Sequence, residues 1–154
     1  MSDRTKSLVP AIALLASLLV PLPMAQAQTH ANGKQDNRIT LEASRSAHRY
    51  AFASPKYNKQ FAYYYSYEVY GWDYSQFKCL VTMWNHESGW KVNAHNPSGA
   101  HGIPQALPGS KMASVGPDWV SNPHTQIKWG LKYIKHRYGT PCGAWSFWQH
   151  HRWY

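Results

Sequence analysis

Carboxylates are scarce in this sequence, above all in its C-terminal half. The 154 residues include 7 aspartates and glutamates against 16 lysines and arginines, which gives a formal net charge of +9. From Trp72 onward the only carboxylates are Asp73, Glu87 and Asp118. So few acids leave few candidates for carboxylate chemistry. Basicity alone names no partner: an exported basic protein would meet anionic polymers of the cell envelope, and a solvated charged surface is the simpler explanation.

The motifs of several enzyme classes are also missing. His86-Glu87 lacks the second histidine that a zinc protease has four residues after the first, because position 90 is a tryptophan. The other histidines show no spacing typical of metal ligands. Gly109-Ser110-Lys111 lacks the spacing of a phosphate-binding loop. We therefore expect neither a metal nor a cofactor.

The longest apolar run lies at the N-terminus and is short for a membrane span. Residues 8–20 are uncharged, Arg4 and Lys6 precede them, and Ala25-Gln26-Ala27 follows with small residues at the positions of a cleavage site. This pattern predicts a signal peptide over residues 1–27, cleaved after Ala27. We expect a secreted or cell-envelope protein with no stable membrane anchor after cleavage and no nucleic-acid partner.

There are only two cysteines, Cys79 and Cys142. In an oxidising compartment they most simply form one disulfide, which would close a loop of more than 60 residues and stabilise the fold by about 4 kcal/mol. The alternative is a thiol peptidase in which Cys142 is a nucleophile beside a histidine.

The composition divides the chain into three parts. Residues 28–56 follow the signal peptide, are polar without an apolar period, and are predicted to be a disordered or weakly structured tether. Residues 57–154 are predicted to be the folded domain, with its core in 71–154, because all eight tryptophans lie between 72 and 153. The tyrosine-rich stretch 60–70 fits an amphipathic helix, but its β-propensity leaves a strand open.

Two helices have clear start signals. Asp73 is typical of an N-cap, and an apolar stripe follows it at Phe77, Leu80, Val81 and Trp84. Asn122 and Pro123 predict the start of a second helix, which Gly139 and Pro141 end. Between the helices, residues 93–121 are expected to form loops, with a short helix near 111–114.

Glu87 continues the apolar stripe of the first helix. Burial disfavours the charged form of a carboxyl group and raises its pKa, which would keep a proton available near neutral pH. Such a group suits a general acid that protonates a glycosidic oxygen. A helix-terminal glutamate held by backbone N–H groups or a lysine fits the pattern equally well.

The residues after Glu87 favour the acid. Glu87-Ser88, followed by Gly99-Ala100-His101-Gly102-Ile103-Pro104-Gln105, resembles the soluble lytic transglycosylase (SLT) domain, closest to the short secreted transglycosylase-like proteins of actinobacteria. The resemblance covers about residues 71–154. It implies a mostly α-helical, small lysozyme-like domain with a loop-rich substrate cleft and one disulfide. It also implies peptidoglycan glycan strands as substrate, cut at the MurNAc–GlcNAc β-1,4 bond. We expect a monomer.

By that match Glu87 is the catalytic acid and base, and Ser88 orients it. Gly102, Ile103 and Gln105 line the sugar cleft, and Trp90 is the first candidate for a tryptophan that stacks on sugar. The cysteines match a cysteine pair of the closer relatives. The sequence departs from the family at His101, where an aromatic residue is usual, in a segment before it that is one residue shorter, and in lacking a Tyr-Asn-Ala-Gly motif.

The shortage of acids bears on the reaction. Asp73 starts the helix that Glu87 ends, so about 21 Å of helix separates them, too far for a catalytic pair. Asp118 is more simply a turn residue. A lytic transglycosylase needs no second carboxylate, because the substrate's own 6-hydroxyl attacks and forms a 1,6-anhydromuramoyl end. The alternatives are a muramidase-type hydrolase aided by Asp118 and a non-catalytic wall-binding module.

Overall fold

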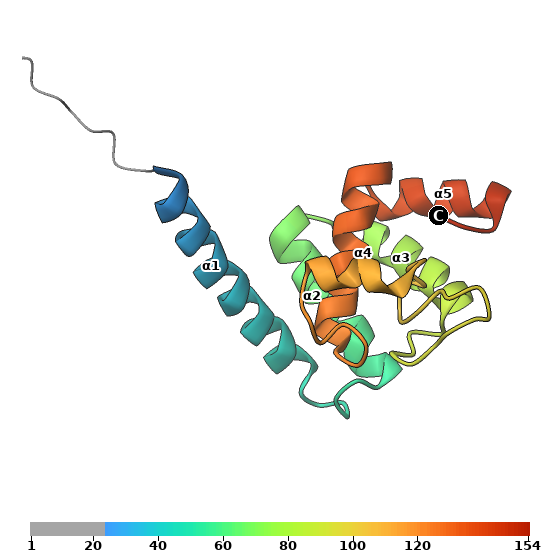
Figure 1. Cartoon of the computed structure of the whole chain (residues 1–154), viewed down its shortest axis with the longest axis horizontal. Helices are drawn as coiled ribbons and strands as arrows, with labels where there is room; N and C mark the ends of the chain where they lie inside the picture. Colours follow the sequence, from blue (N-terminus) through green and yellow to red (C-terminus); the bar gives the residue numbers. More distant parts are fainter. Residues whose placement is uncertain (1–23) are drawn as a thin grey trace, which may run out of the picture.

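The computed structural model describes residues 24–154, which are helical with long loops (Figure 1). The elements in chain order are α1 (Met24–Ala47), α2 (Pro55–Tyr70), α3 (Tyr74–Glu87), the 3₁₀ helix η1 (Gly109–Ser114), α4 (Pro123–Tyr138) and α5 (Pro141–His151). The described residues contain no strand, only isolated bridges that His101 makes with His95 and Ala106. A mostly α fold is thus confirmed. The predicted signal peptide lies almost wholly outside the described residues.

Three of the helices begin with the same two-residue signal, a polar N-cap followed by proline. Ser54, Asn122 and Thr140 each accept a hydrogen bond from a backbone N–H in the first turn of α2, α4 and α5 respectively. The proline that follows has a fixed φ and no N–H to leave unsatisfied. α3 begins at Asp73, whose carboxylate accepts from the N–H of Gln76 at 3.0 Å. The predicted starts of α3 and α4 are confirmed, and the stretch 60–70 is helical.

The prediction of a disordered tether over residues 28–56 is wrong, because most of this segment belongs to α1 (Figure 1). Ile39, Ala43 and Ala47 recur every four residues and are buried in the common core. Two of the three are alanines, so the apolar stripe is too weak to recognise in the sequence. No described helix, the 24-residue α1 included, combines the length and apolar character needed to cross a membrane.

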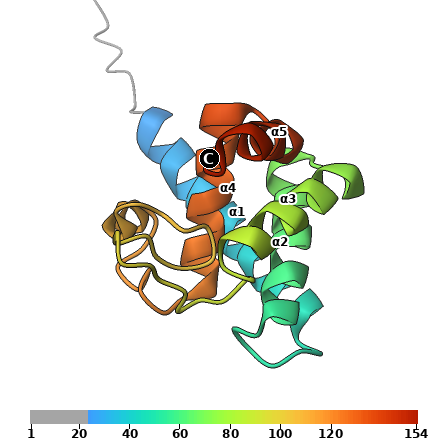
Figure 2. The same ribbon diagram turned by 90° about the vertical axis from the view of Figure 1, so that its right-hand side faces the viewer.

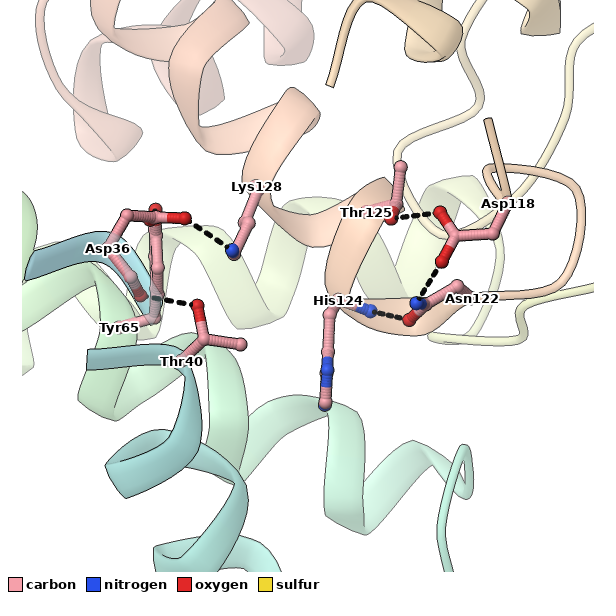
Figure 3. Close-up of polar contacts among 8 residues, drawn as sticks. All are labelled: Asp36, Thr40, Tyr65, Asp118, Asn122, His124, Thr125 and Lys128. Atoms are coloured by element: carbon pink, nitrogen blue, oxygen red, sulfur yellow. Dashed lines mark hydrogen bonds and ion pairs between the residues drawn. The ribbon is translucent and has the colours of Figure 1, made fainter. Parts of the chain in front are cut away.

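Polar contacts fasten α1 to the domain (Figure 3). The carboxylate of Asp36 accepts from Lys128 Nζ of α4 at 2.8 Å and from the Tyr65 hydroxyl of α2 at 2.5 Å. Burial raises the pKa of Asp36, but these two partners outweigh that effect, so the net pKa is below its usual range. The charged form is favoured in the fold, which makes this contact stronger above the ordinary aspartate pKa and weaker as the pH falls.

The core takes residues from all five α-helices and from the loop after α3. Trp84 of α3 and Trp90 of the loop are fully buried and pack edge to face, with ring centroids 5.0 Å apart. Gly130 lets Trp84 and Pro104 pack closely against α4, because a Cβ there would lie 2.7 Å from Trp84 and 2.9 Å from Pro104. The loop residues 89–121 lie together on one side of the helices (Figure 2).

The disulfide prediction is confirmed. Cys79 of α3 is bonded to Cys142 in the first turn of α5, across 63 residues of chain. The structure describes no free cysteine. Cys142 is therefore no thiol nucleophile in the folded protein, and the thiol-peptidase alternative is wrong.

Candidate functional site: a cleft around Glu87

A cleft of about 410 Å³ opens beside the end of α3. Its lining comes from α3, the following loop, η1, α4 and the residues after α5. The lining residues are Glu87, Asn96, Ala100, Pro104, Gln105, Ala106, Leu107, Lys111, Trp129, Tyr133, Arg137, Arg152, Trp153 and Tyr154. Aromatic and other apolar side chains share this lining with charged ones, a combination that is typical of ligand-binding clefts.

Glu87 is the only carboxylate in this lining. It is the last residue of α3, and Ser88 caps the helix behind it. Burial raises the pKa of Glu87, and a hydrogen bond from the Trp148 indole opposes part of that rise. The net shift is upward, so the carboxyl group keeps its proton to a higher pH than an exposed glutamate. The environment is the one that a general acid requires.

Trp148 holds the carboxyl group of Glu87 in place, and the sequence had not pointed to it. Its Nε1 donates to Glu87 Oε1 at 2.5 Å from the middle of α5. The indole is only 8% exposed and packs in a cluster of three rings, with its centroid 4.8 Å from that of His86 and 5.1 Å from that of Trp145. A ring so enclosed has little freedom to turn, so Glu87 has a fixed hydrogen-bond donor.

Substituting Trp148 by phenylalanine should therefore lower activity and change its pH dependence. Loss of a hydrogen bond to a charged group costs about 1.5–3 kcal/mol, so we expect kcat/KM to fall tenfold or more. Because the indole favours the ionised carboxylate, its loss raises the pKa of Glu87 further. The alkaline limb of the pH–rate profile should then move to higher pH.

Trp72→Phe is the matched control, because Trp72 is equally buried, at 5% exposed, but belongs to the core outside the cleft. A merely structural role of Trp148 would lower activity in both variants without moving either pH profile. If the alkaline limb of Trp148→Phe does not shift, the hydrogen bond from the indole does not control the pKa of Glu87.

Gln105 lines the cleft, as the resemblance implies. Its Nε2 donates to the backbone oxygens of Gly102 at 2.9 Å and Ala94 at 3.2 Å. The side-chain amide is thus anchored in its own loop by its nitrogen. Its oxygen is the atom that Gln105 can offer to a hydroxyl group of a ligand.

The other predicted cleft residues support the loop and do not line the cleft. Ser88 Oγ donates to the Ile103 carbonyl at 2.7 Å and accepts from the Trp90 N–H at 3.0 Å, so it ties the loop together instead of orienting Glu87. Ile103 is fully buried, and its N–H donates to Gln126 Oε1 at 2.9 Å. Gly102 lies so close to Gln126 that a Cβ would be 2.5 Å from the same oxygen.

Trp90 is a core residue, and its prediction as a sugar-stacking tryptophan is wrong. It is fully buried, and its backbone carbonyl accepts from the buried Asn58 of α2 at 2.9 Å. In sequence, a tryptophan three residues after the candidate acid fits a cleft and a core equally well. Only the packing distinguishes the two.

The aromatic wall of the cleft comes instead from α4 and from the residues after α5. Trp129, Tyr133 and Arg137 follow one another every four residues and so share one face of α4. The Tyr154 hydroxyl accepts from Trp84 Nε1 at 2.7 Å and donates to the Pro104 carbonyl at 2.9 Å, which joins the chain after α5 to the loop. The four-residue spacing on α4 was a signal in the sequence that could have identified this face.

Asp118 and His101 lie outside the cleft lining. The carboxylate of Asp118 accepts from Thr125 Oγ1 and Asn122 Nδ2, both at 2.6 Å, beside the start of α4 (Figure 3). These bonds hold its pKa below the usual range, so it stays ionised where it stabilises the turn. His101 Nε2 contacts the Val120 carbonyl at 3.0 Å, and its ring meets Trp119 edge to face.

A family model described as "Transglycosylase SLT domain" matches residues 73–150, from the N-cap of α3 to α5. The chain belongs to this family. The match includes Glu87 and Trp148, so the carboxyl group and its indole donor both lie within the family domain. Membership implies the activity of lytic transglycosylases on peptidoglycan.

Searches of curated proteins and of solved structures each found no match to this chain. Among the described residues of this SLT-domain protein, no three His, Cys, Asp or Glu side chains lie close enough together to hold a metal ion.

Proposed function

We propose that this protein is a lytic transglycosylase that cuts the β-1,4 bond between MurNAc and GlcNAc in peptidoglycan and leaves 1,6-anhydromuramoyl ends. The observation that carries the proposal is a cleft whose one carboxylate is half-buried and fixed by an indole donor. The protein acts outside the cytoplasm, in the cell envelope, where its basic surface also meets anionic wall polymers.

In the first step the Glu87 carboxyl group donates its proton to the glycosidic oxygen. The bond from that oxygen to C1 of MurNAc breaks, and the GlcNAc side leaves as an alcohol. The positive charge on the muramoyl ring spreads over C1 and the ring oxygen. Protonation is needed because an alkoxide is a poor leaving group.

In the second step the Glu87 carboxylate accepts the proton of the muramoyl 6-hydroxyl. The oxygen of that hydroxyl attacks C1 and closes the anhydro ring. Glu87 returns to its protonated form, and the nucleophile comes from the substrate. One carboxyl group that acts first as acid and then as base is therefore sufficient.

Product analysis tests this function. Purified sacculi are digested, and the soluble muropeptides are identified by mass spectrometry with and without borohydride reduction. Anhydro products are lighter than hydrolytic products by one water and resist reduction. Reducing ends from the wild-type protein would show hydrolysis, and undigested sacculi would show a non-catalytic module.

The placement of Asp118 gives a further prediction. A hydrolase that uses Asp118 to activate water would lose nearly all activity in Asp118→Asn. Because Asp118 is bonded to Thr125 and Asn122 outside the cleft lining, we expect this variant to keep its rate within about twofold. Its melting temperature should fall slightly, since two hydrogen bonds at the start of α4 weaken. A loss of rate without loss of fold would favour the hydrolase.

A further inference from the structure

Three cations line the cleft, and none has an acidic partner in the described part of the chain. They are Lys111 of η1, Arg137 of α4 and Arg152, which follows α5. Among the described residues the one ion pair joins Lys128 to Asp36, both outside the lining. The carboxyl group of Glu87 is bonded to Trp148 and not to any of the three. Cations gathered in a cleft without counter-charges attract an anionic ligand.

The guanidinium of Arg137 is held in a fixed orientation. Its Nη1 donates to the Tyr133 hydroxyl at 3.0 Å, and its Cζ lies 5.1 Å from the Trp153 ring centroid and 5.6 Å from that of Tyr138. The hydroxyl occupies one of five N–H donors. The remaining donors keep the planar fork that binds a carboxylate through two parallel hydrogen bonds.

Arg152 brings a second guanidinium into the cleft lining that includes Glu87. Its backbone is left-handed, with φ of 63°, because it caps the end of α5. Its Cζ lies 5.3 Å from the ring centroid of Trp148, the residue that donates to Glu87. The guanidinium of Arg152 therefore lies over the indole that donates to Glu87, and it is not paired with the Glu87 carboxyl group.

We infer that Arg137 and Arg152 form a carboxylate-binding subsite, through which the enzyme prefers glycan strands whose peptides carry free carboxylates. The inference rests on the proposed function. The peptide branches from the muramoyl ring, whose C1 is the reacting centre beside Glu87. When C1 lies beside Glu87, the carboxylates of that peptide therefore lie within reach of side chains close to Glu87. The N-acetylated sugars are uncharged, so these carboxylates supply the negative charge of the strand.

The test compares two substrates that differ only in charge. Strands are first freed of phosphodiester-linked polymers, so that no phosphate remains. Half of the sample is then treated with carbodiimide and ammonia, which converts peptide carboxylates to carboxamides of nearly the same shape. The measured quantity is the ratio of kcat/KM on untreated strands to kcat/KM on amidated strands.

For the wild-type protein we expect a ratio of about five to ten, since exposed ion pairs each contribute a few-fold. The ratio should decrease at high salt. In Arg137→Gln/Arg152→Gln it should fall to about one. Arg38→Gln/Arg45→Gln removes the same two charges from the exposed surface of α1, outside the cleft, and should leave the ratio at its wild-type value. Arg137→Lys keeps the charge but loses the fork and should give an intermediate ratio.

Equal rates of the wild-type protein on both substrates would overturn the subsite, as would an unchanged ratio in the double variant. A preference that requires attached phosphate polymer would overturn its assignment to carboxylates. If the wild-type protein cleaves neither substrate, the proposed function itself fails. Melting curves confirm that the variants fold, and both arginines are exposed, so folding should be unaffected.

Discussion

Replacing Glu87 by glutamine should reduce the release of anhydromuropeptides by about a thousandfold or more. Glutamine has nearly the same size and can still accept the hydrogen bond of Trp148, but it can neither donate a proton to the glycosidic oxygen nor accept one from the 6-hydroxyl. The two steps depend on one side chain, and no second carboxylate lines the cleft to replace it. The loss should therefore appear in kcat more than in KM.

Glu68→Gln is the matched control. It makes the same change of charge on the exposed surface of α2, outside the cleft. It should digest sacculi at the wild-type rate. Removing the half-buried acid should leave the fold of Glu87→Gln intact, or make it slightly more stable, since a carboxyl group no longer has to be desolvated. Digestion by Glu87→Gln at more than a tenth of the wild-type rate would exclude Glu87 as the acid.

The helices could be predicted where their signals are local. Asp73 and Asn122-Pro123 marked the starts of α3 and α4 correctly. Thr140-Pro141 starts α5 by the same kind of signal, but it follows Gly139 so closely that the sequence indicates Gly139 and Pro141 only as the end of α4. An N-cap and a helix stop can share neighbouring residues, and α5 was missed for this reason.

α1 could not be predicted because its stability is tertiary. An isolated helix with a weak apolar stripe is marginal in water. It is ordered here by burial of Ile39, Ala43 and Ala47 in the common core and by the contacts of Asp36 with Lys128 and Tyr65. Tyr65 lies 29 residues after Asp36, and Lys128 lies 92 residues after it.

In the candidate site, too, the sequence indicates the residues whose signals are local and misses the contacts between distant parts of the chain. Glu87 could be singled out as the candidate acid because its helix, its stripe and the loop after it are contiguous in sequence. Trp148 lies 61 residues from Glu87, and nothing in its neighbourhood indicates which group its indole contacts. Trp90 shows the converse error, since proximity in sequence to Glu87 suggested a cleft position for a side chain that fills the core.

Removing the disulfide should have the largest effect on stability. For a loop closed over 63 residues, the loss of the cross-link in Cys79→Ser/Cys142→Ser costs about 4 kcal/mol of unfolding free energy. Small domains have 5–15 kcal/mol in total, so the variant should melt well below the wild-type protein. Chemical denaturation with guanidinium measures the difference directly.

The disulfide should also affect catalysis before the domain unfolds. Cys142 fixes the first turn of α5 to α3, and Trp148, farther along α5, donates to Glu87 at the end of α3. Without the disulfide, α5 is joined to α3 by packing and by two hydrogen bonds, from the Cys142 N–H to Gln76 Oε1 and from Trp148 Nε1 to Glu87 Oε1. We expect the serine double variant to lose activity at temperatures where its circular dichroism is still native. Dithiothreitol should reproduce this loss in the wild-type protein and change nothing in the variant. Equal thermal profiles of activity and secondary structure in the variant would show that the disulfide stabilises the fold without positioning Trp148.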